Sequence, residues 1–146
     1  MENQKNIPDN SYTFTIIKPS AVKSGYTGLI LDDIIKGGFE ISAMKYLQIS
    51  QTQAETFYAE HKGRPFFDAL VQFMISAPVV VAILKRENAV AEFRKLIGTT
   101  DPATAAEGTI RKKYAVDMRE NAIHGSDCAA SAEMEANFFF SQCERH

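Results

Sequence analysis

One short segment, Asn-Ala-Ile-His-Gly-Ser-Asp-Cys at 121–128, carries an imidazole beside a glycine, a hydroxyl and a carboxylate. Gly125 leaves the backbone next to His124 without a side chain, so a bulky group can approach the ring. Ser126 or Asp127 is expected to cap the following helix, whose N-terminal amides favour an anion. A single histidine near a strand end is more often a structural hydrogen-bonding group. The segment therefore leaves two interpretations open, packing or chemistry on an anionic group such as phosphate.

A carboxylate follows at a useful distance. Ser131 and Glu135 are four residues apart, so they share one face of the expected helix. Glu135 can therefore hydrogen-bond one ring nitrogen of His124, select the tautomer and leave the other nitrogen nucleophilic. A solvated helix charge is the commoner role of a single glutamate and stays the alternative here.

Basic side chains gather in 108–119, although the whole chain has a net charge of −2. They are Arg111, Lys112, Lys113 and Arg119, and Arg94 lies one helix earlier. Guanidinium groups bind phosphate in bidentate geometry and stabilise the charge of a phosphoryl group in transfer, so the cluster favours phosphoryl over acyl chemistry. For the two lysines a solvated basic face is an equal alternative. The chain has no Gly-rich phosphate loop, so side chains must hold the phosphates.

The composition is that of an ordinary globular protein, with 45% hydrophobic and 23% charged residues among 146. We expect a flexible N-terminal arm at 1–10 and one domain at 11–146. Cys128 and Cys143 lack partners at zinc spacing, and the N-terminus does not resemble a signal peptide, which predicts a cytoplasmic protein. The longest apolar run is too short for a membrane helix, and the slight acidity argues against nucleic-acid binding.

Periodic apolar residues predict strands at 12–17, 39–49, 78–85 and 122–124 and helices at 28–36, 50–61, 63–76, 87–98 and 127–142. In the third of these helices Phe66, Leu70, Phe73 and Met74 are expected on one face, with Pro65 in the first turn. Residues 99–121 show little periodicity and predict a long functional loop. The order predicts a two-layer α/β (α+β) sandwich with a ferredoxin-like βαββαβ antiparallel sheet and added short helices.

Five segments in this order resemble nucleoside diphosphate kinases: TIIKPS at 15–20, FYAEHKGRPFF at 57–67, GTT-x-P at 98–102, GTIR at 108–111 and NAIHGSD at 121–127. The resemblance spans residues 12–140. It implies an enzyme that transfers the γ-phosphate of a nucleoside triphosphate, typically ATP, to a nucleoside diphosphate. The implied mechanism is ping-pong, through a phosphohistidine, with low base specificity.

The resemblance also implies roles for individual residues. His124 is the nucleophile and Glu135 orients its ring, while Arg94, Thr100 and Arg111 clamp the phosphates. Tyr58 lies beside the histidine and the transferred phosphate, and Lys18 and Asn121 contact the ribose hydroxyls and nearby phosphates. Phe66 stacks on the base with Leu70 and Met118, although its spacing alone would favour a core phenylalanine.

The same resemblance implies Mg²⁺ as the cofactor, held mainly by the nucleotide phosphates without a direct protein ligand, and through a water to Asp127. It implies a homo-oligomer, for which we expect a hexamer in preference to a tetramer. Ser20 and Cys128 depart from the aspartate and serine that are usual in this family. Two alternatives stay open: a phosphohistidine carrier that passes phosphate to proteins, and a noncatalytic regulatory or nucleic-acid-binding module.

Overall fold

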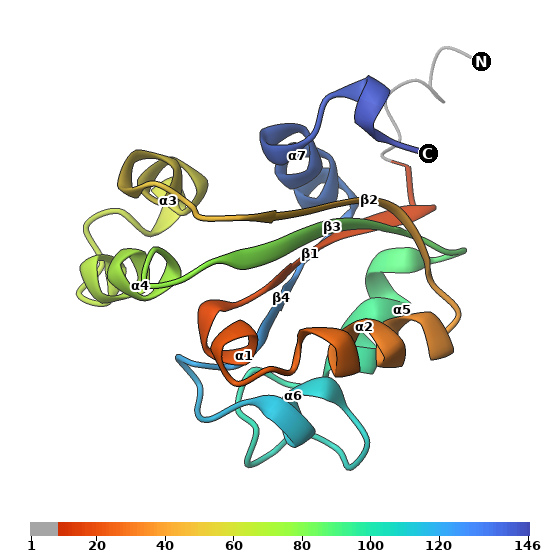
Figure 1. Ribbon diagram of the computed structural model, residues 1–146, viewed down its shortest axis with the longest axis horizontal. Helices are drawn as coiled ribbons and strands as arrows, with labels where there is room; N and C mark the ends of the chain where they lie inside the picture. The colour runs from red at the N-terminus through yellow and green to blue at the C-terminus, as the bar shows by residue number, and fades with distance from the viewer. Residues whose placement is uncertain (1–8) are drawn as a thin grey trace.

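The computed structural model describes residues 9–146, which form a four-stranded antiparallel sheet in the order β2-β3-β1-β4 (Figure 1). This confirms the predicted ferredoxin-like topology. In chain order the elements are β1 (Tyr12–Ile17), α1 (Pro19–Lys23), α2 (Thr27–Lys36), β2 (Glu40–Leu47), α3 (Gln51–Phe57), the 3-10 turn η2 (Ala59–His61), α4 (Phe67–Met74), β3 (Val79–Lys85), α5 (Ala89–Ile97), α6 (Ile110–Tyr114), β4 (Ile123–Gly125), α7 (Ala129–Phe139) and η3 (Gln142–Glu144).

The inner strand β3 is buried on both faces, as its continuous run of branched residues predicts. Its alternate residues enter two separate cores. Those facing α3, α4 and α7 are Val79, Val81 and Ile83, and those facing α2 and α5 are Val80, Ala82 and Leu84. Helices thus cover both faces of the sheet, so the expectation of only two layers is wrong (Figure 1).

Several helix boundaries differ from the prediction. The helix expected at 50–61 stops at Phe57, because Tyr58 leaves helical geometry before η2 begins. In the next helix the prediction is confirmed for Met74, which is buried, and for Leu70 and Phe73, which pack against the core. It is wrong for Phe66, which is 42% exposed, while Phe67 and Val71 are buried in its place. Helices α1 and α6 were not predicted; Thr109 caps α6 by accepting a hydrogen bond from the Lys112 amide.

The chain ends of the described region lie on the surface. Residues 1–8 of the expected flexible arm lie outside the described residues, while the carbonyl of Asn10 accepts a hydrogen bond from the Ala89 amide at 3.0 Å. Between residues 9 and 146, no helix combines the length and apolarity needed to cross a bilayer.

The short strand β4 lies against helix α5, and the contact leaves no room for a side chain at Gly125. A Cβ atom there would lie 3.0 Å from both Ile97 Cδ1 and Phe93 Cδ2. The glycine is therefore required by packing behind the strand, whereas the sequence suggested that it opens access to the imidazole.

We predict that Gly125→Ala lowers the free energy of unfolding by about 1–3 kcal/mol, because the added methyl group overpacks the α5 contact. Gly28→Ala is the matched control: nothing lies within 4 Å of its Cβ position, and alanine suits a helix better than glycine. Urea denaturation measures both variants. Equal stabilities of the two variants would contradict the packing explanation.

Candidate active site

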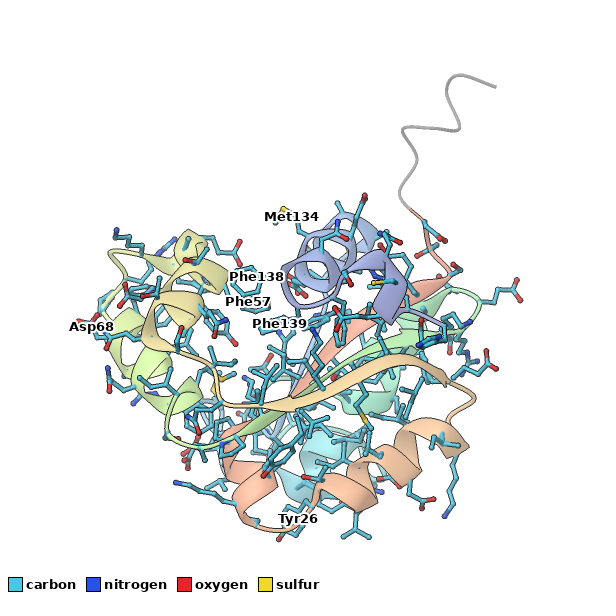
Figure 2. The ribbon with its side chains drawn as sticks, turned by 45° about the horizontal axis from the view of Figure 1, so that its top comes forward. Tyr26, Phe57, Asp68, Met134, Phe138 and Phe139 are labelled. Atoms are coloured by element: carbon cyan, nitrogen blue, oxygen red, sulfur yellow. The ribbon has the colours of Figure 1, made fainter. Side chains whose placement is uncertain are left out.

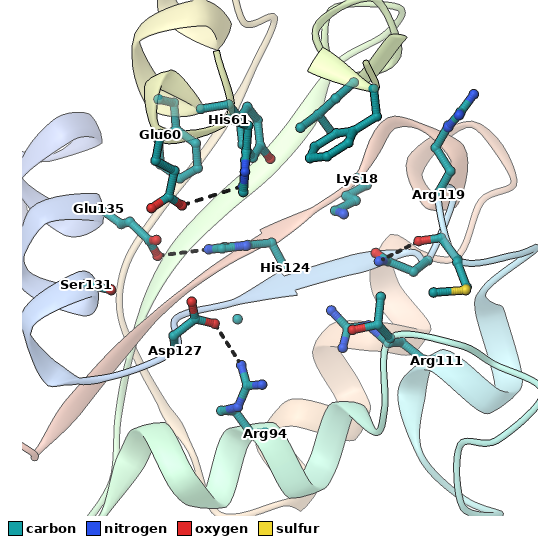
Figure 3. Close-up of a pocket in the computed structure, with 18 residues that line it drawn as sticks. Lys18, Glu60, His61, Arg94, Arg111, Arg119, His124, Asp127, Ser131 and Glu135 are labelled. Atoms are coloured by element: carbon teal, nitrogen blue, oxygen red, sulfur yellow. Dashed lines mark hydrogen bonds and ion pairs between the residues drawn. The ribbon is translucent and has the colours of Figure 1, made fainter. Parts of the chain in front are cut away.

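A pocket of about 700 Å³ opens between α3, η2 and α4 on one side and α7 on the other (Figure 3). Lys112 and Lys113 of the basic segment are not in its lining, and Lys113 instead pairs with Asp33. The site residues implied by the family resemblance all line it. They are Lys18, Tyr58, Phe66, Leu70, Arg94, Thr100, Arg111, Met118, Asn121, His124, Asp127 and Glu135. Contributions come from both ends of the chain, and the sheet brings them together because β4 pairs with β1.

His124 is held at both its backbone and its ring. Its carbonyl accepts a hydrogen bond from Thr15 Oγ1 at 2.8 Å, and its Nε2 lies 2.8 Å from Glu135 Oε1. A carboxylate only accepts, so Nε2 carries the proton and Nδ1 carries the lone pair. Nδ1 has no hydrogen-bond partner between residues 9 and 146. The contact expected from the sequence is present, and it leaves one ring nitrogen available.

A second donor reaches the same carboxylate oxygen. Ser126 Oγ donates to Glu135 Oε1 at 2.7 Å, and its side chain is fully buried. The sequence assigned Ser126 or Asp127 to the cap of α7, but Cys128 occupies that position and its Sγ accepts from the Ser131 amide. Ser126 therefore positions the glutamate instead of capping the helix.

Aromatic rings form the wall behind the imidazole. Phe57 meets the His124 ring edge-on with centroids 5.8 Å apart, and Phe14 lies 6.2 Å away. Phe57 in turn contacts Phe138 and Phe139 of α7, each at 5.5 Å, in the space between α3 and α7 (Figure 2). These rings pack against the imidazole, and its side chain stays 21% exposed.

Two cations at the floor of the pocket lack a carboxylate partner among the described residues. Lys18 and Arg111 are 7% and 8% exposed. Arg111 donates to the carbonyls of Gly98 and Ile123 at 3.0 and 2.8 Å, and its Nε is buried without a partner. Burial, together with the nearby Arg111 charge, lowers the pKa of Lys18 to about 7. Burial, and then the charge of Arg94, lowers the pKa of Arg111 to about 10. An anion in the pocket would neutralise both.

The carbonyl that holds Arg111 depends on a close approach at the end of α5. Gly98 has φ +86°, and a Cβ there would lie 2.6 Å from Thr109 Oγ1. Only glycine adopts this conformation at little cost and also admits the threonine that caps α6. The unpredicted helix α6 is thus what carries Arg111 into the pocket.

Arg94 is held at the rim by an acidic neighbour. Its NH1 lies 3.1 Å from Asp127 Oδ1, and the two side chains are 49% and 80% exposed. An exposed pair of this kind contributes about 0–1 kcal/mol, so the guanidinium can leave Asp127 for a stronger anion. Thr100 lines the same part of the pocket.

A strained turn precedes β4. Ala122 has φ +74°, and the Ile123 amide donates to the Asn121 carbonyl at 2.9 Å, which is the three-residue γ-turn of the rarer hand. The Ala122 carbonyl accepts from the Lys18 amide at 2.8 Å, so the turn is bonded to the end of β1. The Asn121 amide nitrogen donates to the Met118 carbonyl, and its Oδ1 is buried with no partner among residues 9–146. Strain of this kind is common where polar groups are pre-positioned.

The other end of the pocket is apolar and open. Phe66 and Met118 are 42% and 59% exposed, and Leu70 lies with them in the lining. Deeper in, the Tyr58 hydroxyl is buried and has no hydrogen-bond partner in the described part of the chain, and burial raises its pKa. The exposed aromatic ring is suited to stacking, and the deep hydroxyl is suited to donation.

No cluster of three or more His, Cys, Asp or Glu side chains suited to a metal ion occurs within residues 9–146. The carboxylate near the cationic end is Asp127, which is 80% exposed. Mg²⁺ commonly binds through substrate phosphates, waters and one or two carboxylates, and this single exposed carboxylate fits that donor set.

The sequence did not identify every residue of the pocket. Phe57, Glu60 and His61 also line it, and Phe57 becomes visible only once α3 is seen to pack on α7. His61 lies 5.3 Å from the Phe66 ring and 3.6 Å from a Glu60 oxygen. His61 reaches the pocket because α3 ends at Phe57 and the 3-10 turn η2 follows. The periodicity of the sequence predicted one continuous helix instead.

We predict that Lys18→Met makes the protein more stable, by about 1–3 kcal/mol at neutral pH, because it removes an uncompensated buried charge. The folded-state pKa is about 7 against an ordinary 10.5, so the unfolded chain binds more protons between these values. The gain should be largest below pH 7 and shrink as the pH rises to 10.5. Thermal unfolding against pH measures it, with the exposed Lys23→Met as control. A less stable variant, or a pH-independent gain, would contradict the assignment.

The nucleoside diphosphate kinase family model matches residues 11–145. A nucleoside diphosphate kinase of Lawsonia intracellularis is 52% identical over 134 residues, covering 92% of this chain and 97% of that protein. One of Chlorobium limicola is 53% identical over 129 residues, covering 88% and 92%. The solved nucleoside diphosphate kinase of Aquifex aeolicus has a TM-score of 0.90 and 42% identity, covering 93% of this chain and 99% of that one. That of Halobacterium salinarum, in complex with CDP, has a TM-score of 0.90 and 36% identity, covering 94% and 92%. The chain therefore belongs to the nucleoside diphosphate kinase family, the phosphotransferases that pass phosphate from nucleoside triphosphates to nucleoside diphosphates.

Proposed function

We propose that this enzyme transfers the γ-phosphate through a covalent phosphohistidine on Nδ1 of His124. The observation that carries the proposal is the Nε2 contact with Glu135, which leaves Nδ1 as the free nitrogen in a pocket with two buried cations. In the first half-reaction Nδ1 attacks the γ-phosphorus, and the bond to the bridging oxygen breaks to release a nucleoside diphosphate. In the second, a terminal oxygen of an incoming diphosphate attacks the phosphohistidine and the N–P bond breaks.

Glu135 stabilises the positive charge that the ring gains on phosphorylation. Its oxygen holds the Nε2 proton throughout, so no proton has to leave the ring during either half-reaction. Ser126 keeps that oxygen in place by donating to it. The two residues hold one tautomer, which makes Nδ1 the nucleophile in every cycle.

Phosphate binding falls to the cations and hydroxyls of the floor and rim. Arg111 provides buried charge, and Lys18 becomes fully charged when a phosphate beside it raises its pKa again. Arg94 exchanges Asp127 for a phosphate oxygen, with Thr100 beside it. Fixed donors of this kind stabilise the charge on the transferring phosphoryl group without reorganising during the reaction. The unpartnered Tyr58 hydroxyl donates to the same group.

The nucleoside occupies the open, apolar end. Phe66 stacks on one face of the base, and Leu70 and Met118 complete the clamp. Asn121 presents its unpartnered Oδ1 to the ribose hydroxyls, and Lys18 reaches the nearest phosphate. Stacking accepts any base, so the contact by itself gives low base specificity. The CDP complex of the Halobacterium salinarum relative supports a nucleotide in this site.

Mg²⁺ on the nucleotide phosphates would supply charge neutralisation and hold the phosphates in a reactive arrangement. In this chain Asp127 is the side chain that would accept hydrogen bonds from its waters once Arg94 has moved to phosphate. No direct protein ligand is proposed.

We further propose a homo-oligomer, a hexamer in preference to a tetramer. Apolar side chains on α2 and the edge strand β2 support an assembled state: Leu29, Ile35, Met44 and Tyr46 are 50–66% exposed. Cys128 and Cys143 are free and exposed, which supports the reducing cytoplasm as the compartment.

Mixing the protein with ATP and Mg²⁺ should give one acid-labile phosphoryl adduct in the intact mass, because a phosphohistidine hydrolyses in acid. His124→Ala should give none, with the fold retained in circular dichroism. Adding a nucleoside diphosphate to the phosphorylated wild type should discharge the adduct within seconds into triphosphate. An adduct that resists discharge would instead indicate a phosphate carrier, and turnover by His124→Ala would refute the nucleophile.

Glu135→Gln should slow phosphorylation by about 100-fold, because the amide no longer stabilises the charged ring and can turn its donor toward Nε2. Glu133→Gln, an exposed change on the same helix, should have the wild-type rate. Single-turnover measurements of adduct formation compare them. Equal rates for the two variants would remove Glu135 from the mechanism.

A further inference from the structure

Arg119 lines the pocket but has no task in the mechanism above. Its side chain makes no hydrogen bond or ion pair with any residue from 9 to 146, unlike Arg94 and Arg111. Its backbone is fixed, however, because Asp117 Oδ1 accepts from the amides of Arg119 and Glu120 at 2.9 and 2.8 Å. A fixed turn thus places Arg119 at the edge of the pocket, with a guanidinium that is free among residues 9–146 and exposed to solvent.

The position of Arg119 is at the nucleoside end. It lies across the pocket from Glu135 and Ser131 and points away from Arg111 (Figure 3). It follows Met118 directly, and Phe66 and Leu70 are the apolar residues of the same lining that form the proposed nucleoside end. A phosphate at Lys18 and Arg111 therefore leaves Arg119 to the part of the nucleotide farthest from the reaction, which is the base.

We infer that Arg119 contacts the edge of the bound base and favours 6-oxopurines, guanine and hypoxanthine, over adenine. The inference rests on the nucleotide placement proposed above. A guanidinium only donates, and its fork matches the O6 and N7 acceptors of a 6-oxopurine. Adenine has N7 but carries an amino group at position 6, which presents hydrogens to the same fork.

The preference is modest because the arginine is solvated at the rim. With adenine bound, the guanidinium keeps its water and loses nothing, so adenine nucleotides stay good substrates. With a 6-oxopurine it gains up to two hydrogen bonds at an exposed site. We therefore expect a several-fold preference for 6-oxopurine over adenine nucleotides, in addition to the stacking on Phe66, which does not distinguish the bases.

The test compares inosine diphosphate with adenosine diphosphate as phosphate acceptors. Their bases differ only in the group at position 6, oxo or amino, and in the proton that the oxo form carries on N1. Wild type should show a kcat/KM ratio of about 3- to 10-fold in favour of inosine diphosphate. Arg119→Ala should bring the ratio close to one, and Arg119→Lys, which keeps the charge but loses the fork, should fall between them. Arg64→Ala, an exposed arginine that does not line the pocket, should keep the wild-type ratio.

Equilibrium binding of the same two diphosphates to each protein provides a second, activity-independent ratio. A wild type that binds both equally, or an Arg119→Ala protein that retains the selection, overturns the inference. Failure of any protein to transfer phosphate would instead count against the proposed function, while the binding ratio would still decide the role of Arg119.

Discussion

The site depends on positive charge buried where no carboxylate of residues 9–146 pairs with it. Lys18 and Arg111 are almost completely enclosed, and the partners of Arg111 are backbone carbonyls, which orient it without cancelling its charge. A neutralising Asp or Glu at the floor would make the empty protein more stable and would weaken its attraction for phosphate. In the proposed mechanism this stability is exchanged for anion binding, as is common in enzyme sites.

Glu60, Asp127 and Glu135 line the pocket, and none of them pairs with Lys18 or Arg111. Glu135 is occupied by His124 and Ser126 and lies on the other side of the imidazole from Lys18 and Arg111 (Figure 3). Asp127 pairs only with the exposed Arg94 at the rim. In the proposed mechanism, Glu135 therefore serves the nucleophile and Asp127 serves the movable Arg94.

The sequence predicted much of this because some of its signals are local. The continuous run at 78–85 can be little other than a buried strand, and the spacing of Ser131 and Glu135 requires only a helix. The residues assigned from the family resemblance all meet in one pocket. The sequence did not predict helix α6, because five residues are too few for a helical period to be recognised.

The sequence also failed to predict features that are contacts between segments distant in the chain. The bond from Ser126 to Glu135 and the packing of Gly125 on Phe93 both depend on how β4 lies between α5 and α7. Strand β4 has only three residues, and successive side chains point to opposite faces of the sheet: Ile123 enters the core under α5, whereas His124 faces Phe14 and Phe57. A single insertion or deletion between Asn121 and Gly125 would turn His124 to the wrong face, whereas the loop before α6 has no such alternation. Variation in chain length among relatives should therefore be concentrated in that loop and absent from the five residues around the histidine.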